Sequence, residues 1–174
     1  TNCTHNGFVR SSKVSQGRKI KFSDTGLKEK FDNLKNLDAN TLGSESEDLV
    51  NSLLAQEGYE FHSSHFPGLG GNNGFDGVLI KRDASGNIED VIINETKQVS
   101  ASGTIQLNPA AGSLPQQMSD DWIDDVLLRM EFAGGGHEKL ANVIKEAKKH
   151  EKITKLISGV DKHKNELVLL NLGG

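Results

Sequence analysis

The chain has 174 residues, a formal net charge of −4, 34% hydrophobic residues and one cysteine. This length is enough for one hydrophobic core of good size, and no apolar run approaches the roughly 18 residues that a membrane span needs. The single cysteine excludes an internal disulfide and leaves no readable structural zinc site. Because the chain begins with Thr rather than Met, we expect a globular domain taken from a longer protein.

Basic residues gather in two segments although the net charge is negative. Residues 1–30 hold seven Lys or Arg and two acids, and residues 139–155 hold six Lys and two Glu. Apolar residues in the second segment follow helical spacing. A basic helix there could hold phosphates, and a solvated helix face is the alternative. Residues 1–38 show little periodicity apart from the basic run GRKIKF.

The first clear helix signal is TLGSESEDLVNSLLAQEGYEF, residues 41–61. Its apolar spacing predicts an amphipathic helix that ends at the Gly-Tyr pair. Ser44 or Ser46 would cap its start, and acids in the first turn suit the helix dipole. Glu47 differs from Glu45, because apolar residues follow Glu47 three and seven positions later. Helix phase therefore places Glu47 at the edge of the core-facing stripe.

Two histidines and a Gly-rich loop come next. The loop, GLGGNNG, has neither the Gly-Lys-Ser/Thr ending nor the GxGxxG spacing of phosphate-binding loops. We interpret it as a flexible connection that allows close approach of the chain. His62 and His65 lack further zinc ligands, and His65 is a candidate for a minor role beside a site.

Residues 74–98 predict a β-hairpin whose turn is Asp-Ala-Ser-Gly-Asn. If the hairpin is centred between positions 85 and 86, facing residues have numbers that add up to 171. Asp76 then lies opposite Glu95, and Lys97 shares the face of Glu95 because side chains alternate along a strand. The same register pairs Val78 with Ile93, Ile80 with Val91 and Arg82 with Glu89.

The charged end of this hairpin needs an explanation. Two carboxylates directly opposite each other, about 5 Å apart, repel. A cation between them removes the conflict, and it could be the Lys97 ammonium or a divalent metal such as Mg²⁺, which prefers carboxylate oxygens. A solvated, charged strand end is the alternative interpretation.

The C-terminal third predicts two helices and a strand. The segment QQMSDDWIDDVLLRM predicts a helix capped by Ser119, with Trp122 on its apolar face. The run Ala-Gly-Gly-Gly at 133–136 separates it from the basic helix, and ELVLLNL at 166–172 predicts a late strand. The order of elements predicts an α/β or α+β fold with a mixed central β-sheet flanked by helices.

An acid on a helix that ends in Gly-Tyr, then Asp76, then Glu95-x-Lys97, resembles the PD-(D/E)XK family of restriction-endonuclease-like nucleases. The segments GGNNGFDGV, ETK and QQMSDDWI, in that order, resemble more narrowly the toxin domains at the C-termini of large exported bacterial proteins. Contact-dependent growth inhibition toxins belong to that group. The resemblance spans roughly residues 43–130, and Phe75 stands where the family motif has proline.

This resemblance implies a restriction-endonuclease-like core and a metal-dependent nuclease. In such a site Asp76, Glu95 and the carbonyl of Thr96 would hold a divalent metal, with Mg²⁺ preferred and Mn²⁺ or Zn²⁺ as alternatives. Lys97 would orient the attacking water or stabilise charge on phosphorus, and Glu47 would hold a second metal or its water. Each of these roles is an expectation from the resemblance.

The resemblance also implies a substrate and partners. The substrate would be nucleic acid, with tRNA slightly favoured over DNA, and Gln117, Lys148 and Lys149 are the candidate contacts to it. A cognate immunity protein would block the toxin, which would be exported within a larger surface protein and act in the target-cell cytoplasm. Residues 1–38 would be an arm or delivery segment, or an arm packed on the core, and residues 39–174 the nuclease domain. The alternative function is a non-catalytic binding or delivery module.

Overall fold

The computed structural model describes residues 4–5, 7–24, 26, 28–34, 36–37, 39–63, 74–112 and 115–173. The elements in chain order are β1 (Thr4–His5), β2 (Phe8–Val9), α1 (Ser11–Val14), β3 (Arg18–Lys21), a 3-10 turn (Phe22–Asp24), α2 (Lys28–Leu34), α3 (Ala39–Gln56), β4 (Glu60–His62), β5 (Gly77–Arg82), β6 (Ile88–Gln98), β7 (Ile105–Gln106), α4 (Asp120–Ala133), α5 (Gly135–Lys149), β8 (Ile153–Asp161) and β9 (Glu166–Asn171).

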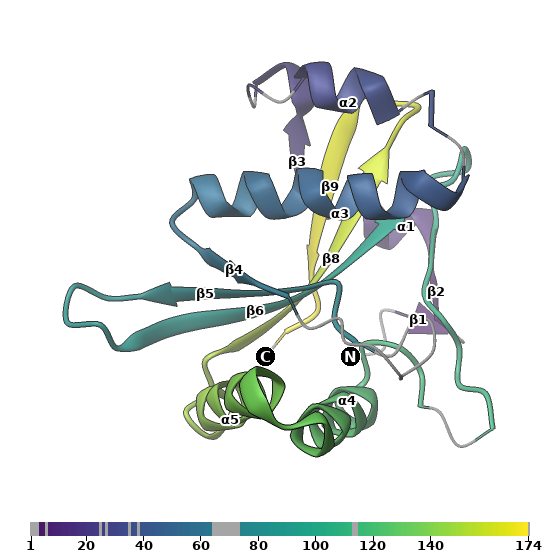
Figure 1. Ribbon diagram of the computed structural model, residues 1–174. Coiled ribbons are helices and arrows are strands. Elements are labelled where there is room, and N and C mark those ends of the chain that lie inside the picture. The colour runs from purple at the N-terminus through teal and green to yellow at the C-terminus, as the bar shows by residue number, and fades with distance from the viewer. Residues whose placement is uncertain are drawn as a thin grey trace.

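A six-stranded sheet in the order β3-β9-β8-β6-β5-β4 forms the centre of the molecule. Strands β6 and β8 are parallel, and the other neighbours are antiparallel. Helices α2 and α3 lie on one face, and α4 and α5 lie on the other (Figure 1). This mixed α+β architecture confirms the predicted fold class and is compatible with a restriction-endonuclease-like core. In the described part of the chain, no helix is long and apolar enough to span a membrane.

Both faces of the central strands are buried, because each face packs against helices. Successive side chains alternate between the two faces. In β5, Val78 and Ile80 join the core on the α4 and α5 side, whereas Leu79 joins the core beneath α3. Strand β6 divides in the same way, with Ile92 beneath α3 and Ile93 on the opposite face. The hairpin is therefore anchored by two cores, which fixes its register.

The β5–β6 hairpin has the predicted register toward the site and departs from it near the turn. Arg82 pairs with Ile88 rather than with Glu89, because the register shifts between Lys81 and Arg82. Such a bulge places an extra residue on one strand. The predicted Arg82–Glu89 pair is thus wrong. The apolar pairs are confirmed: Val78 with Ile93 and Ile80 with Val91.

Helix α3 begins earlier than predicted. It starts at Ala39, so Ser44 and Ser46 lie inside the helix and neither caps it. Leu42, half-buried against the core beneath α3, extends the apolar stripe by another turn. Ser46 is fully buried, and its hydroxyl accepts a hydrogen bond from Gln98 Nε2 at 2.8 Å.

The basic segment 139–155 is only partly helical. Helix α5 ends at Lys149, and Glu151 has a positive φ of 56°. That left-handed conformation stops the helix, and Ile153 then begins β8, the parallel partner of β6. The prediction that helical spacing continues through Ile153 is therefore wrong at the C-terminal end of the segment. The predicted late strand is confirmed as β9.

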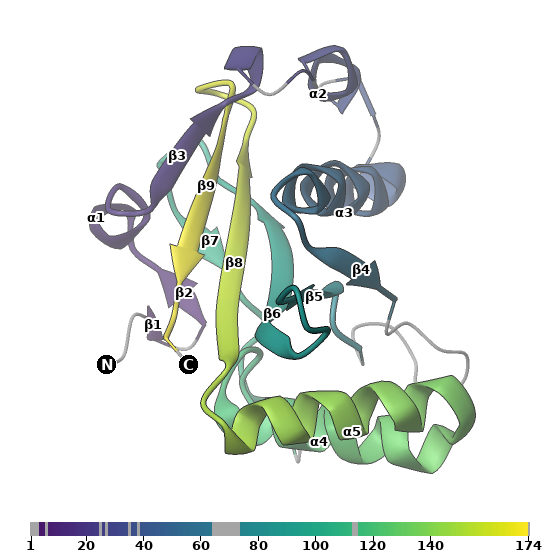
Figure 2. The same ribbon diagram turned by 90° about the vertical axis from the view of Figure 1, so that its left-hand side faces the viewer.

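The N-terminal segment contributes to the same sheet. Strand β3 pairs with β9 along its whole length and forms one edge (Figure 2). Val14 packs into the core on the α4 and α5 side, and Phe31 stacks on Phe22 with ring centroids 3.8 Å apart. The described residues of 1–38 are therefore packed on the core, which was one of the two alternatives expected for them. A delivery role stays a prediction.

Candidate active site

Asp76 and Glu95 lie together at the end of the β5–β6 hairpin. The last strand pair is Gly77 with Asn94. Asp76 precedes Gly77 and Glu95 follows Asn94, so both acids lie just beyond this pair. The main-chain N–H of Asp76 donates to Glu95 Oε1 at 3.3 Å, and that of Thr96 donates to Asp76 Oδ2 at 2.9 Å. These reciprocal contacts hold the two carboxyl groups opposite each other, as the hairpin register predicts.

The surroundings of Glu95 disfavour the negatively charged form of its side chain. Its side chain is 1% exposed. Burial, the neighbouring charge of Asp76 and a hydrogen bond between the two side chains raise the pKa of Glu95 well above its ordinary value of 4.5, whereas the Lys97 ammonium counteracts this. Carboxyl groups held together in this way retain a proton or require a cation. Such perturbed acids gather at functional sites.

Gln117 fixes the orientation of the Glu95 carboxylate. It is 4% exposed, and its Nε2 donates to Glu95 Oε2 at 2.8 Å. Its Oε1 accepts a hydrogen bond from the main-chain N–H of Asn108 at 3.0 Å, and its own N–H donates to the Asn108 carbonyl at 3.0 Å. Both ends of the amide are therefore held. The candidate substrate contact at Gln117 is, in the structure, a contact to Glu95.

We expect Gln117→Met to lower divalent-metal affinity or activity by about 10- to 100-fold, as loss of a group that supports a metal ligand commonly does. Met has similar length and volume, so packing is largely kept, but it cannot donate to Glu95. Metal titration and cleavage rates would measure the change. Gln56→Met, at an exposed position near the end of α3, is the control. Equal behaviour of both variants would contradict the role of Gln117.

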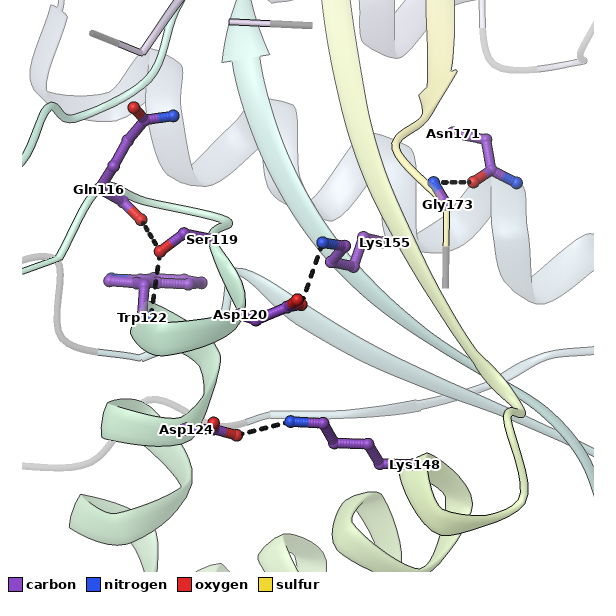
Figure 3. Close-up of polar contacts among 9 residues, drawn as sticks. All are labelled: Gln116, Ser119, Asp120, Trp122, Asp124, Lys148, Lys155, Asn171 and Gly173. Carbon is purple, nitrogen blue, oxygen red and sulfur yellow. Dashed lines mark hydrogen bonds and ion pairs between the residues drawn. The ribbon is translucent and has the colours of Figure 1, made fainter. Parts of the chain in front are cut away.

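Helix α4 anchors the other side of the site. The Ser119 hydroxyl accepts a hydrogen bond from the main-chain N–H of Trp122 at 3.1 Å, which confirms the predicted cap (Figure 3). Trp122 is buried and meets Phe75 edge to face, with ring centroids 5.5 Å apart. Phe75 directly precedes Asp76. The aromatic pair thus packs α4 against the loop that carries the first carboxylate.

Glu47 lies on the part of α3 that crosses the same end of the hairpin. It is half-buried, whereas Glu45 is exposed. One helical turn after Glu47, Asn51 lies so close to Gly77 that a Cβ at position 77 would be 2.7 Å from Asn51 Oδ1. Among the described residues, no three His, Cys, Asp or Glu side chains gather at metal-binding spacing. A second-metal role for Glu47 therefore stays a prediction.

We expect Gly77→Ala to lower the free energy of unfolding by about 1–3 kcal/mol, because the added methyl group overpacks the contact with Asn51. Gly43→Ala is the matched control in the same helix-sheet layer. Nothing lies within 4 Å of a Cβ at Gly43, which is inside α3. That change should stabilise by about 0.5–1 kcal/mol. Denaturant unfolding measures both, and stabilisation by Gly77→Ala would contradict the close approach.

Thr96 and Lys97 follow Glu95 on alternate faces of β6. Lys97 is half-buried on the face of Glu95, near enough to influence its pKa. The Thr96 side chain points to the opposite face, where its Oγ1 accepts a hydrogen bond from Asn94 Nδ2 at 3.1 Å. The Thr96 N–H contacts Asp76, as described above. Metal binding by the Thr96 carbonyl remains a prediction.

The other candidates contact carboxylates other than Asp76 and Glu95. Lys148 pairs with Asp124 at 2.8 Å (Figure 3), and Lys149 is 3.8 Å from Glu146. Their charges thus have carboxylate partners, and their role as substrate contacts stays a prediction. His62 is half-buried on the edge strand β4 and contacts Glu60. His65 and most of the Gly-rich loop lie outside the described residues.

Two polar contacts at or near the site were missed by the sequence analysis. Asn108 acts through its main-chain groups, so its residue type does not reveal the contact with Gln117. Beneath α3, the fully buried Ser158 and Asn94 form a hydrogen bond of 2.5 Å between β8 and β6. Asn94 lies beside Glu95 in the sequence, and an amide within an otherwise apolar strand could have indicated a polar layer there.

Comparisons of the chain with protein-family models, with curated proteins and with solved structures found no match. No family is therefore assigned by similarity. The function proposed below rests on the geometry of the two acids and on the sequence motifs that contain them.

Proposed function

We propose that the chain is a metal-dependent nuclease of the PD-(D/E)XK, restriction-endonuclease-like type. The observation that carries the proposal is the buried Glu95 held against Asp76, with Lys97 on the same face of β6. Carboxyl groups whose pKa is raised by burial beside a second carboxylate are concentrated at functional sites. The mixed sheet with helices on both faces supports the same proposal.

The residues present fit a hard divalent cation. Asp76 and Glu95 offer carboxylate oxygens, and such oxygen ligands suit Mg²⁺ or Mn²⁺ better than Zn²⁺. When bound, the ion would supply Lewis-acid activation of water and neutralise charge on the phosphoryl group. A divalent charge would also relieve the repulsion that raises the pKa of Glu95.

The chain's own groups have separate tasks in phosphodiester hydrolysis. Asp76 and Glu95 would hold the cation, and Gln117 keeps the Glu95 carboxylate oriented through its 2.8 Å hydrogen bond. Lys97 stabilises the negative charge that grows on the phosphoryl oxygens and orients the attacking nucleophile. The buried position of Glu95 strengthens these electrostatic effects, since the local dielectric is low.

We further propose that this nuclease is a toxin domain of a larger exported bacterial protein. The order of GGNNGFDGV, ETK and QQMSDDWI supports this. It would act on nucleic acid in the cytoplasm of a target cell, with tRNA slightly favoured over DNA. A cognate immunity protein would neutralise it in the producing cell.

A parallel digest tests the proposal. Purified protein is incubated with plasmid DNA and with total tRNA in Mg²⁺, Mn²⁺, Zn²⁺ or EDTA, beside Glu95→Gln. We expect one nucleic acid to be cleaved with metal, with no cleavage in EDTA or by the variant. Absence of cleavage under every condition would favour the non-catalytic binding module instead.

A further inference from the structure

A pocket with several polar residues in its lining lies beyond the site, at the far end of β6. It has a volume of about 370 Å³. Helix α1, strand β3, the turn after β6 and the turn between β8 and β9 contribute to its walls. Ser11, Ser12, Ser100 and Ser102 supply hydroxyl groups to its lining. Three basic side chains, Lys19, His163 and Lys164, also line it, and we call it the Lys19 pocket.

The charge of the Lys19 pocket is positive. Within the described part of the chain, Lys19, His163 and Lys164 form no ion pair with a carboxylate. The one acid in the lining, Asp161, is 3% exposed. Its Oδ1 accepts hydrogen bonds from the main-chain N–H groups of His163 and Lys164, at 2.9 and 3.0 Å. Asp161 thus organises the turn that carries two of the basic side chains.

The pocket and the site are related by one face of β6. Glu95, Lys97 and Val99 follow each other at every second position, and Val99 lines the pocket. The Val99 N–H donates to the Val160 carbonyl at 3.0 Å, which continues the strand pairing beyond Gln98. Four extended residues span about 13 Å. Phosphates along one nucleic-acid strand are spaced closely enough for such a distance to cover a few nucleotides.

Two glycines let the walls of the pocket approach the sheet. A Cβ at Gly17, in the turn between α1 and β3, would be 2.6 Å from Val168 Cγ1. A Cβ at Gly159 would be 2.8 Å from Val99 Cγ2. Both positions are closed to larger residues by packing. The N-terminal segment, which contains α1 and β3, therefore packs closely against β9 (Figure 2). This packing brings Lys19 to the end of β6.

We propose that the Lys19 pocket binds a backbone phosphate of the nucleic-acid substrate, a few nucleotides from the bond that is cleaved. This inference rests on the proposed function. It assigns to the basic N-terminal segment a task in holding substrate. It also distinguishes Lys19 and Lys164 from Lys148 and Lys149, which already have carboxylate partners.

Salt-dependent binding tests this inference. The affinity of the full chain for fluorescently labelled single-stranded DNA and RNA oligonucleotides is measured in EDTA over a series of NaCl concentrations. Each single-strand phosphate that the protein neutralises adds about 0.7 to the steepness of log K against log salt. The double variant Lys19→Gln/Lys164→Gln removes the site for one phosphate, so it should show a slope shallower by about 0.7 and bind more weakly at low salt. Comparison of the two oligonucleotides shows whether DNA or RNA supplies the phosphate.

Lys30→Gln is the control for the change of charge. Lys30 is exposed on α2 and does not line the Lys19 pocket, so the slope of this variant should equal that of the wild type. A wild-type slope in the double variant would overturn the inference even if the protein cleaves nucleic acid. A reduced slope in a protein that cleaves nothing would uphold the phosphate site and count against the nuclease. Absence of binding by the wild type would also overturn the inference, whereas the digest with metal decides separately whether the protein is a nuclease.

Discussion

Replacing Glu95 by Gln is expected to abolish metal-dependent cleavage and, at the same time, to raise the free energy of unfolding at neutral pH. The amide removes a cation ligand, so we expect cleavage to fall by about 10³-fold or more. It keeps the shape of the side chain and can still accept from Gln117. It also removes a carboxyl group that is 1% exposed beside Asp76, which relieves an unfavourable charge.

The sign of the stability effect follows from the raised pKa of Glu95. The folded chain holds this proton more tightly than the unfolded chain does. The contribution to stability is therefore complete below the ordinary Glu pKa of 4.5 and is lost as pH rises through the folded-state pKa. Because the amide of Glu95→Gln carries no charge at any pH, we expect this variant to be more stable than the wild type above that pH.

Denaturant unfolding across pH measures this gain, and cleavage is assayed on the same samples. Glu89→Gln is the matched control, because Glu89 is an exposed acid on the same strand. It should change neither property appreciably. A Glu95→Gln variant that is less stable than the wild type at neutral pH would show that the carboxylate is needed for folding. That result would contradict the account of Glu95 as a functional acid.

Replacing Lys97 by Met should lower cleavage by about 10²- to 10⁴-fold while divalent-metal binding persists. Lys97 is not proposed as a ligand, and its ammonium stabilises charge on the phosphoryl group or assists proton transfer. Its removal also takes away a positive charge that lowers the pKa of Glu95, so the pKa of Glu95 should rise further. The pH at which metal binding reaches half its maximum should therefore rise.

Single-turnover cleavage and Mn²⁺ titration separate the two effects of Lys97→Met. Lys81→Met is the control for removal of an ammonium group, because Lys81 is half-buried on β5 as Lys97 is on β6. Loss of metal binding together with cleavage would assign Lys97 a structural role at the site. Unchanged cleavage would remove Lys97 from the proposed chemistry.

The sequence was sufficient for those features that depend on local pattern. Strand alternation and the turn residues predicted which side chains of β5 and β6 face each other, and Ser119 was recognised as a cap from its neighbours. The bulge at Lys81 and Arg82 was not predicted, because the expected register assumed no extra residue on either strand near the turn.

Features that depend on distant contacts were missed or misplaced. Strand β8 contains Lys155 and directly follows a basic helix. In the sequence, its first residues therefore looked like a continuation of that helix. Its pairing with β6 across the α4–α5 crossover comes from tertiary structure. The contact of Gln117 with Glu95 was anticipated only as an approach to the site, since the Asn108 main chain that fixes it has no residue signature.

The most direct test of the account is calorimetric titration of Mn²⁺ into the wild type and into Asp76→Asn and Glu95→Gln. We predict saturable binding to the wild type and a large loss of affinity in both variants, with folding of each variant confirmed by circular dichroism. Equal Mn²⁺ binding by all three proteins would contradict the central claim that Asp76 and Glu95 form the metal centre, and so would the absence of saturable binding to the wild type.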